Sequence, residues 1–149
     1  GHRGANGIDG LLSAATGDAA ATGRRVIALV GDLSLLHDVG AFVTARTLDV
    51  DLTIVVVNNN GGGIFHFLPQ ADQPGPFELL TTPHSLDLGA IASGFGASYH
   101  LAQTEDELRV RMERAKGISV IEVRTDRAEN VAIHTDLWAR ARAAVAGLA

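Results

Sequence analysis

The sequence contains no cysteine, which excludes both a disulfide framework and a zinc site built on thiolates. It also has no apolar run that approaches the roughly 20 residues of a membrane-spanning helix, and no secretory signal is visible at its start. We therefore expect a cytoplasmic protein that has no part in a membrane.

Basic residues are in the minority, with 12 Lys and Arg against 17 Asp and Glu, and no basic block stands out. Nucleic-acid binding depends on clustered positive charge, so we do not expect it to be the main activity. The 149 residues, 46% hydrophobic and 19% charged, suffice for one globular domain with its own core. Because the chain starts abruptly at Gly1-His2-Arg3, we expect residues 1–149 to be a fragment of something longer.

Strands and helices alternate along the predicted fold. Two runs, 25–31 and 51–57, are apolar without alternation, as in strands buried on both faces of a parallel sheet. Shorter strands are predicted at 97–101 and 117–125. Helices are predicted at 8–23, 34–48, 85–96, 104–116 and 134–149, with a possible further helical start at 62–70 before a proline-broken loop around Pro74, Pro76 and Pro83. The order predicts a three-layer, doubly wound α/β fold with a parallel sheet and helices on both faces.

Two helices carry more specific signals. Thr104 and Glu107 have the spacing of a capping box, so the helix at 104–116 has a defined start. The terminal helix at 134–149 contains Trp138, the largest side chain available to anchor it.

Both long strands end in polar turns that contain glycine. "GDLS" follows the first strand at residues 31–34, and "NNNGGG" follows the second at residues 58–63. In folds of this class ligands bind beyond the carboxyl ends of the strands. The second turn also has more asparagine and glycine than a plain turn needs, so we expect both turns to contribute to one site.

The residue types in these turns suit a magnesium ion and a phosphate group. Asp32 offers a carboxylate, Asn59 an amide oxygen, and a glycine near Gly61 a backbone carbonyl. Mg²⁺ prefers oxygen ligands in an octahedron and is usually shared with substrate phosphates. Ser34 would direct its hydroxyl and the following helix start toward those phosphates. Alternatively, Asp32 and Ser34 are ordinary helix caps and residues 58–63 an ordinary loop.

The spacing between the turns resembles the thiamin-diphosphate motif, in which GDG and NN are separated by a spacer in the mid-twenties. Leu33 departs from the general motif, which has glycine at that position. Four segments taken in order are similar to one family, the menaquinone-pathway 2-succinyl-5-enolpyruvyl-6-hydroxy-3-cyclohexene-1-carboxylate synthases: "RGANGIDGLLS", "GDLSLLHD", "VVVNNNGGGIFHFLPQ" and "TPHSLD". The resemblance covers residues 3 to about 125 and concerns the C-terminal, diphosphate-binding domain of that family.

The resemblance implies a role for each matching residue. Asp32 and Asn59 would bind Mg²⁺, or alternatively Mn²⁺, by their side chains, and Gly61 by its carbonyl. The cofactor would lie against residues of both turns and of the first helix, namely Gly31, Asp32, Leu33, Ser34, Asn59, Gly61 and Ile8.

Four residues would act close to the reaction. Ile8 would be the apolar wedge that keeps thiamin diphosphate bent, and Arg3 would meet a substrate carboxylate. Ile64 and Phe65 would pack against the bound intermediate and substrate. Ordinary alternatives remain for each: Ile8 as core, Arg3 as a solvated terminal charge, and Ile64 with Phe65 as a covered helix start. The segment at 82–87 suggests only a turn and an N-cap.

By the same resemblance, the whole enzyme is a transferase that decarboxylates 2-oxoglutarate and adds the succinic semialdehyde unit to isochorismate. It would be a homodimer or homotetramer, in which the pyrimidine-binding domain of another subunit supplies a glutamate that activates the cofactor. No such glutamate is found in this chain, so the isolated fragment is expected to be inactive. Two alternatives stay open: an acetolactate-synthase-like thiamin-diphosphate decarboxylase, and a silent metal-diphosphate-binding module.

Overall fold

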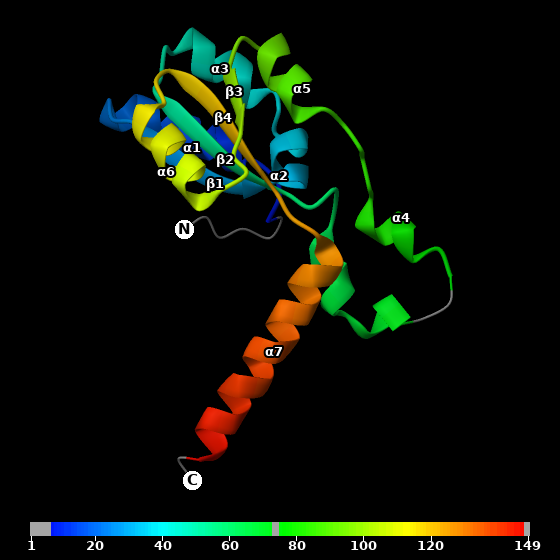
Figure 1. Ribbon diagram of the computed structural model, residues 1–149. Coiled ribbons are helices and arrows are strands. Elements are labelled where there is room, and N and C mark those ends of the chain that lie inside the picture. Colours follow the sequence, from blue (N-terminus) through cyan, green and yellow to red (C-terminus); the bar gives the residue numbers. More distant parts are fainter. Residues whose placement is uncertain (1–6, 73–74, 148–149) are drawn as a thin grey trace.

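The computed structural model describes residues 7–72 and 75–147. Its centre is a parallel four-stranded sheet in the order β1-β2-β4-β3 (Figure 1). The strands are β1 Val26–Gly31, β2 Leu52–Asn58, β3 Ser98–Leu101 and β4 Ile118–Arg124. All four predicted strands are confirmed to within one or two residues, and their carboxyl ends lie along one edge of the sheet.

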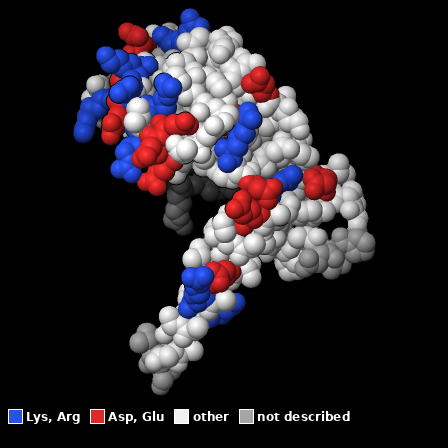
Figure 2. All heavy atoms as spheres, viewed as in Figure 1, with Lys and Arg blue, Asp and Glu red and all other residues white. Residues whose placement is uncertain are grey.

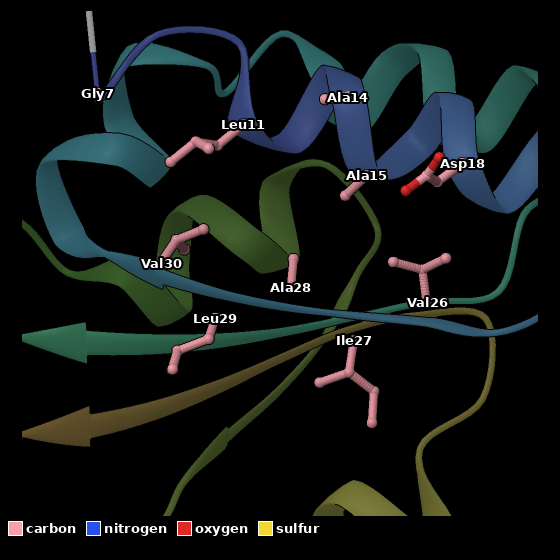
Figure 3. Close-up of a pocket in the computed structure, with 10 residues that line it drawn as sticks. All are labelled: Gly7, Leu11, Ala14, Ala15, Asp18, Val26, Ile27, Ala28, Leu29 and Val30. Carbon is pink, nitrogen blue, oxygen red and sulfur yellow. The ribbon is translucent and has the colours of Figure 1, made fainter. Parts of the chain in front are cut away.

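One face of the sheet carries the hydrophobic core. Helices α1 (Leu11–Thr22), α3 (Ala41–Thr47) and α5 (Leu88–Gly94) cover this face. Alternate residues of the strands point toward them, and Figure 3 shows the side chains of α1 above those of β1. The largest side chains that are almost fully buried here are Leu12, Leu35, Phe42, Leu52, Ile54 and Leu88. Burial of such a side chain contributes about 1.5–3 kcal/mol.

The opposite face is covered by α6 (Glu105–Arg114), which lies over β4. The Thr104 side chain caps α6 by accepting from the amide of Glu107, and the Glu107 carboxylate accepts from the amide of Gln103. Helices therefore lie on both faces of the parallel sheet, as predicted. On the side of α6 the edge strand β1 is less protected, and Ile27 and Leu29 are 44% and 72% exposed.

The single helix predicted at 34–48 is two helices, α2 (Asp32–His37) and α3. The break lies at residues 38–40, where the Asp38 carboxylate accepts from both the amide and the hydroxyl of Ser13. The prediction was wrong here because this contact joins residues 25 positions apart, which apolar spacing cannot report.

Residues 63–72 and 75–81 contain short helical turns that contact one another, so the helical start predicted at 62–70 is confirmed and the loop predicted after it is partly helical. They are η1 (Gly63–Phe67), η2 (Pro69–Asp72) and α4 (Phe77–Thr81). Pro74, part of the predicted loop, lies outside the described residues.

The terminal helix α7 (Arg127–Ala146) begins seven residues before the predicted start at residue 134. Asp126 caps it by accepting from the amide of Glu129. The helix extends away from the sheet (Figure 1). Trp138 is 50% exposed and contacts the ring of Phe67 at a centroid distance of 5.6 Å, so it packs on η1 and does not anchor the helix in the core.

Charged side chains of both signs are interspersed on the face shown in Figure 2. Along α7 the figure shows long stretches without charge, and Ile133, Leu137 and Val145 are each more than half exposed. Among the helices described, none is both long and apolar enough to span a membrane.

Candidate functional site

The turns after β1 and β2 meet at the carboxylate of Asp32. This residue opens α2 and is only 2% exposed. Its Oδ1 atom accepts from the amide of Leu33 at 2.8 Å, and its Oδ2 atom accepts from the amide of Gly61 at 2.7 Å. The structure therefore brings together the two turns that the sequence singles out.

The three consecutive asparagines of the second turn occupy three different environments. Asn58 ends β2, and its side chain donates to Glu122 at 2.9 Å and accepts from the amide of Asn60. Asn60 has a left-handed backbone with φ of 61°, a conformation that asparagine tolerates better than most residues. Its side-chain oxygen accepts from the amides of His84 and Ser85. These two residues build the turn.

Asn59 differs from its neighbours. Its Oδ1 atom is buried and has no hydrogen-bond partner within residues 7–72 and 75–147. Gly63 lies so close that an added Cβ would overlap the Asn59 amide nitrogen. A buried oxygen without a partner is costly, so this atom suits a ligand that arrives from outside the chain.

Gly61 is required by the shape of the second turn. Its φ of 130° is unfavourable for residues with a side chain, and a Cβ there would overlap the carbonyl oxygen of Thr81. The amide of Gly62 donates to that same carbonyl at 2.6 Å, and the Gly61 carbonyl accepts from Gly63. The backbone of the second turn is thus in direct contact with the backbone of Thr81.

We call residues 81–86 the strap, because they lie across the second turn. The strap is held by the Thr81 carbonyl, by the Asn60 side chain, and by a contact of 3.0 Å between His84 Nε2 and Asp32 Oδ2. From the sequence we expect only a turn and an N-cap at residues 82–87. The N-cap is present, because Asp87 accepts from the amide of Ala90, but the contacts of His84 and Asn60 were missed. The contact of His84 with Asp32 joins residues 52 positions apart, and the contact of Asn60 with His84 joins residues 24 positions apart. No local sequence pattern indicates either of them.

A buried carboxylate on the neighbouring strand supports the second turn. Glu122 of β4 is fully buried and accepts from Asn58, from the Tyr99 hydroxyl at 2.6 Å and from Arg124 Nε at 2.7 Å. Burial acts to raise the pKa of Glu122, but these three hydrogen bonds outweigh it and the pKa is lowered. Burial, together with the hydrogen bond to Glu122, raises the pKa of Tyr99 to about 12.

The other predicted site residues differ in how far they are exposed. Gly31 is exposed at the end of β1, while Ser34 is buried in α2 and Leu33 is partly buried. Ile8 precedes α1 and is 37% exposed, which does not fit a core residue. Ile64 is 70% exposed and Phe65 partly buried, both in η1. Arg3 lies outside the described residues.

The donor set fits a hard cation such as Mg²⁺. Counting the hydrogen bonds of the described residues, Asp32 Oδ1 has one lone pair left for a metal and Asn59 Oδ1 has two. In residues 7–72 and 75–147 no three His, Cys, Asp or Glu side chains gather as a metal cluster. An ion at this edge would therefore rely on one carboxylate, neutral oxygens and a phosphate-bearing ligand, which is the arrangement that Mg²⁺ commonly adopts.

Comparison with known proteins gives consistent results. Residues 5–123 match the family described as "Thiamine pyrophosphate enzyme, C-terminal TPP binding domain". A 2-succinyl-5-enolpyruvyl-6-hydroxy-3-cyclohexene-1-carboxylate synthase from Myxococcus xanthus is 53% identical over 97% of this chain and 25% of the relative. A synthase of the same name from Listeria monocytogenes is 47% identical over 93% of this chain and 24% of the relative. The chain thus spans about a quarter of the length of these relatives.

The fold also matches a solved structure. The thiamine diphosphate-dependent 4-hydroxybenzoylformate decarboxylase of Rhodococcus jostii RHA1 aligns with a TM-score of 0.66 and 24% identity, over 78% of this chain and 23% of that protein. At this level of identity the match supports the α/β fold alone.

Proposed function

The chain belongs to the thiamine pyrophosphate enzyme family, of which it contains the C-terminal cofactor-binding domain, and from this premise we propose that it supplies the metal- and diphosphate-binding half of a larger active site. The observations that carry the proposal are the meeting of the two turns at Asp32 and, in the second turn, a buried Asn59 oxygen that has no partner among the described residues. A buried carboxylate and a buried amide oxygen on two turns that meet are typical metal ligands and poor core residues.

In this proposal Asp32 and Asn59 bind Mg²⁺, or Mn²⁺ in its place, through their side-chain oxygens. Gly61 adds its carbonyl, which has a second lone pair beside the hydrogen bond to Gly63. The residues from Gly31 to Ser34 lie next to the diphosphate and fix its position. When bound, thiamin diphosphate supplies the carbon that takes up negative charge during decarboxylation.

Three apolar residues are assigned to the reacting end of the cofactor. Ile8 would keep the cofactor bent, and Ile64 with Phe65 would cover the substrate and keep water away. Their exposure supports this assignment, because Ile64 is 70% and Ile8 37% exposed in the described part of the chain. Arg3 is proposed to contact a substrate carboxylate, since its planar donor fork matches that group.

For the whole enzyme we propose the reaction of the synthases to which the chain is similar: decarboxylation of 2-oxoglutarate and addition of the resulting four-carbon unit to isochorismate in menaquinone biosynthesis. Support comes from the name shared by the relatives, at 53% and 47% identity, and from the four sequence segments found in order.

The test is product analysis with the complete purified enzyme, thiamin diphosphate and Mg²⁺. We expect 2-oxoglutarate and isochorismate together to give the 2-succinyl-cyclohexene carboxylate product. Formation of acetolactate from pyruvate, without that product, would contradict the proposed substrates and favour the decarboxylase alternative. Absence of cofactor binding would contradict the proposed site itself.

We further propose that the active site is completed by a pyrimidine-binding domain of another subunit in a homodimer or homotetramer. The exposed apolar residues of α7, among them Ile133 and Leu137, are consistent with a covered surface in an assembly. The chain alone should then show no turnover, and adding the separately produced N-terminal part should restore it. Turnover by the chain alone would contradict this arrangement.

A further inference from the structure

His84 is held from two sides by hydrogen bonds, and this fixes which ring nitrogen carries the proton. Its side chain is 10% exposed. The Nδ1 atom accepts from the amide of Leu86 at 3.0 Å, so that nitrogen is an acceptor. The proton of the imidazole is then on Nε2, which lies 3.0 Å from Asp32 Oδ2 and donates to it.

The two oxygens of Asp32 consequently have different surroundings. Oδ2 accepts from Gly61 and from His84, and these bonds use both of its lone pairs. Oδ1 accepts only from the amide of Leu33 and keeps one lone pair. A metal can bind Oδ1 while His84 and Gly61 continue to hold Oδ2.

The strap fixes His84 in this position independently of its ring. The Asn60 side chain accepts from the amides of His84 and Ser85, and the Thr81 carbonyl accepts from Gly62. The second turn therefore holds the strap, and the strap in turn places the imidazole against the carboxylate of the first turn.

We propose that His84 is a positioning residue for the metal site: its Nε2–H group orients the Asp32 carboxylate so that Oδ1 is presented to the cation. The inference rests on the proposed function, because it assumes that Asp32 binds the metal of the thiamin-diphosphate site. Partners that orient a metal-binding side chain commonly contribute about 10–100-fold to metal affinity.

The experiment compares Mg²⁺ affinity by calorimetric titration in the complete enzyme saturated with thiamin diphosphate. His84→Leu removes the donor, and we expect the dissociation constant for Mg²⁺ to rise by about 10–100-fold. His84→Gln has a similar size and can place an N–H group near the position of Nε2, so its affinity should stay close to that of the wild type. His37→Leu is the matched control, because His37 is exposed and only approaches Asp9 at 3.7 Å.

A purely structural role of the imidazole would not give this difference between leucine and glutamine. An unchanged Mg²⁺ affinity in His84→Leu, or equal losses in both variants, would overturn the inference while leaving the proposed function intact. Failure of the wild type to bind Mg²⁺ would overturn both.

A measurement on the wild type does not depend on whether the variants fold. The Nε2–H proton of His84, observed by nuclear magnetic resonance, should remain hydrogen-bonded when Mg²⁺ is added. Loss of this signal at saturating Mg²⁺ would show that the metal displaces the imidazole, and the inference would be wrong.

Discussion

The turn after β1 and the turn after β2 meet at Asp32, yet they are built differently. The first passes directly from strand to helix within residues 31–34, and it provides the Asp32 carboxylate at the meeting point. The second needs six residues, a left-handed Asn60, and support from both the strap and Glu122. The backbone of the first turn runs straight from strand to helix, and only its Asp32 side chain is held by distant residues. The backbone of the second turn itself depends on parts of the chain far away in sequence.

This difference suggests that the two turns contribute differently to the proposed metal site. The short turn supplies the charge that attracts the cation. The long turn supplies neutral oxygens, and its many contacts hold them in place before the metal arrives. Substitutions that alter one turn at a time can test this difference.

The largest effect is expected for Asp32→Ala in the complete enzyme. Removing the only carboxylate of the site should weaken Mg²⁺-dependent binding of thiamin diphosphate by more than about 100-fold, beyond what a residue that only orients a ligand contributes. Asn59→Ala should come close to this loss. Calorimetric titration with and without Mg²⁺ measures it, and unchanged affinity in Asp32→Ala would end the metal assignment.

The next largest effect is expected on stability, when a glycine of either turn is replaced by alanine. Gly61→Ala should destabilise the protein by about 1–3 kcal/mol or more, because it forces a strained φ and a Cβ would meet the Thr81 carbonyl. Gly31→Ala should stay within about 0.5 kcal/mol, since its φ of −82° suits any residue and no atom of the described residues lies within 4 Å of the added Cβ. Chemical denaturation gives both values, and equal losses would contradict the comparison.

Glu122→Gln tests the support beneath the second turn. Because hydrogen bonds to a charged group are lost, the free energy of unfolding at neutral pH should fall by about 1–3 kcal/mol. The pKa of Glu122 is lowered in the folded state, so its contribution is present above the unfolded pKa of about 4.3. It is lost as the pH falls through the folded pKa.

The variant should therefore show a weaker loss of stability in acid than the wild type. Tyr99 affects stability in the opposite pH range, because its pKa is raised to about 12 and not lowered. Its contribution is present below its unfolded pKa of about 10 and is lost as the pH rises toward 12. Denaturation curves between acid and alkaline pH would check this, and parallel curves for variant and wild type would exclude a role for the Glu122 charge.

The smallest effect is expected for Asn60→Ala. It removes the acceptor for the amides of His84 and Ser85 and places alanine at a φ of 61°, which together should cost about 1–2 kcal/mol of stability. Its Mg²⁺ affinity should fall less than that of Asn59→Ala, because Asn60 holds the strap and not the ion. A larger loss in Asn60→Ala than in Asn59→Ala would reverse the roles assigned to these two residues.

Much of the sheet could be predicted from sequence because buried parallel strands are apolar throughout, and the four strands were placed to within one or two residues. The meeting of the two turns also follows from sequence, since carboxyl ends of parallel strands share one edge. The cap at Thr104 is equally local. The start of α7 was missed although Asp126 and Glu129 have capping-box spacing, so a usable signal was present.

The remaining features depend on contacts between distant residues. The break between α2 and α3 involves Ser13, and the environment of Asp32 includes His84 from 52 positions away. Trp138 was expected to be an anchor because of its size, but α7 extends from the sheet and leaves it half exposed. The spacing of apolar residues indicates which side chains favour burial. It does not indicate which surface of the folded protein is available to cover them.

The central claim is that one metal ion joins the two turns, and the most direct test is to locate that ion. Crystals of the complete enzyme with thiamin diphosphate and Mn²⁺ would show the metal by its anomalous scattering. We expect a single peak in each site, in direct contact with Asp32 Oδ1 and Asn59 Oδ1, with diphosphate oxygens completing the coordination. A metal bound away from either turn, or a cofactor bound with its diphosphate elsewhere, would contradict it.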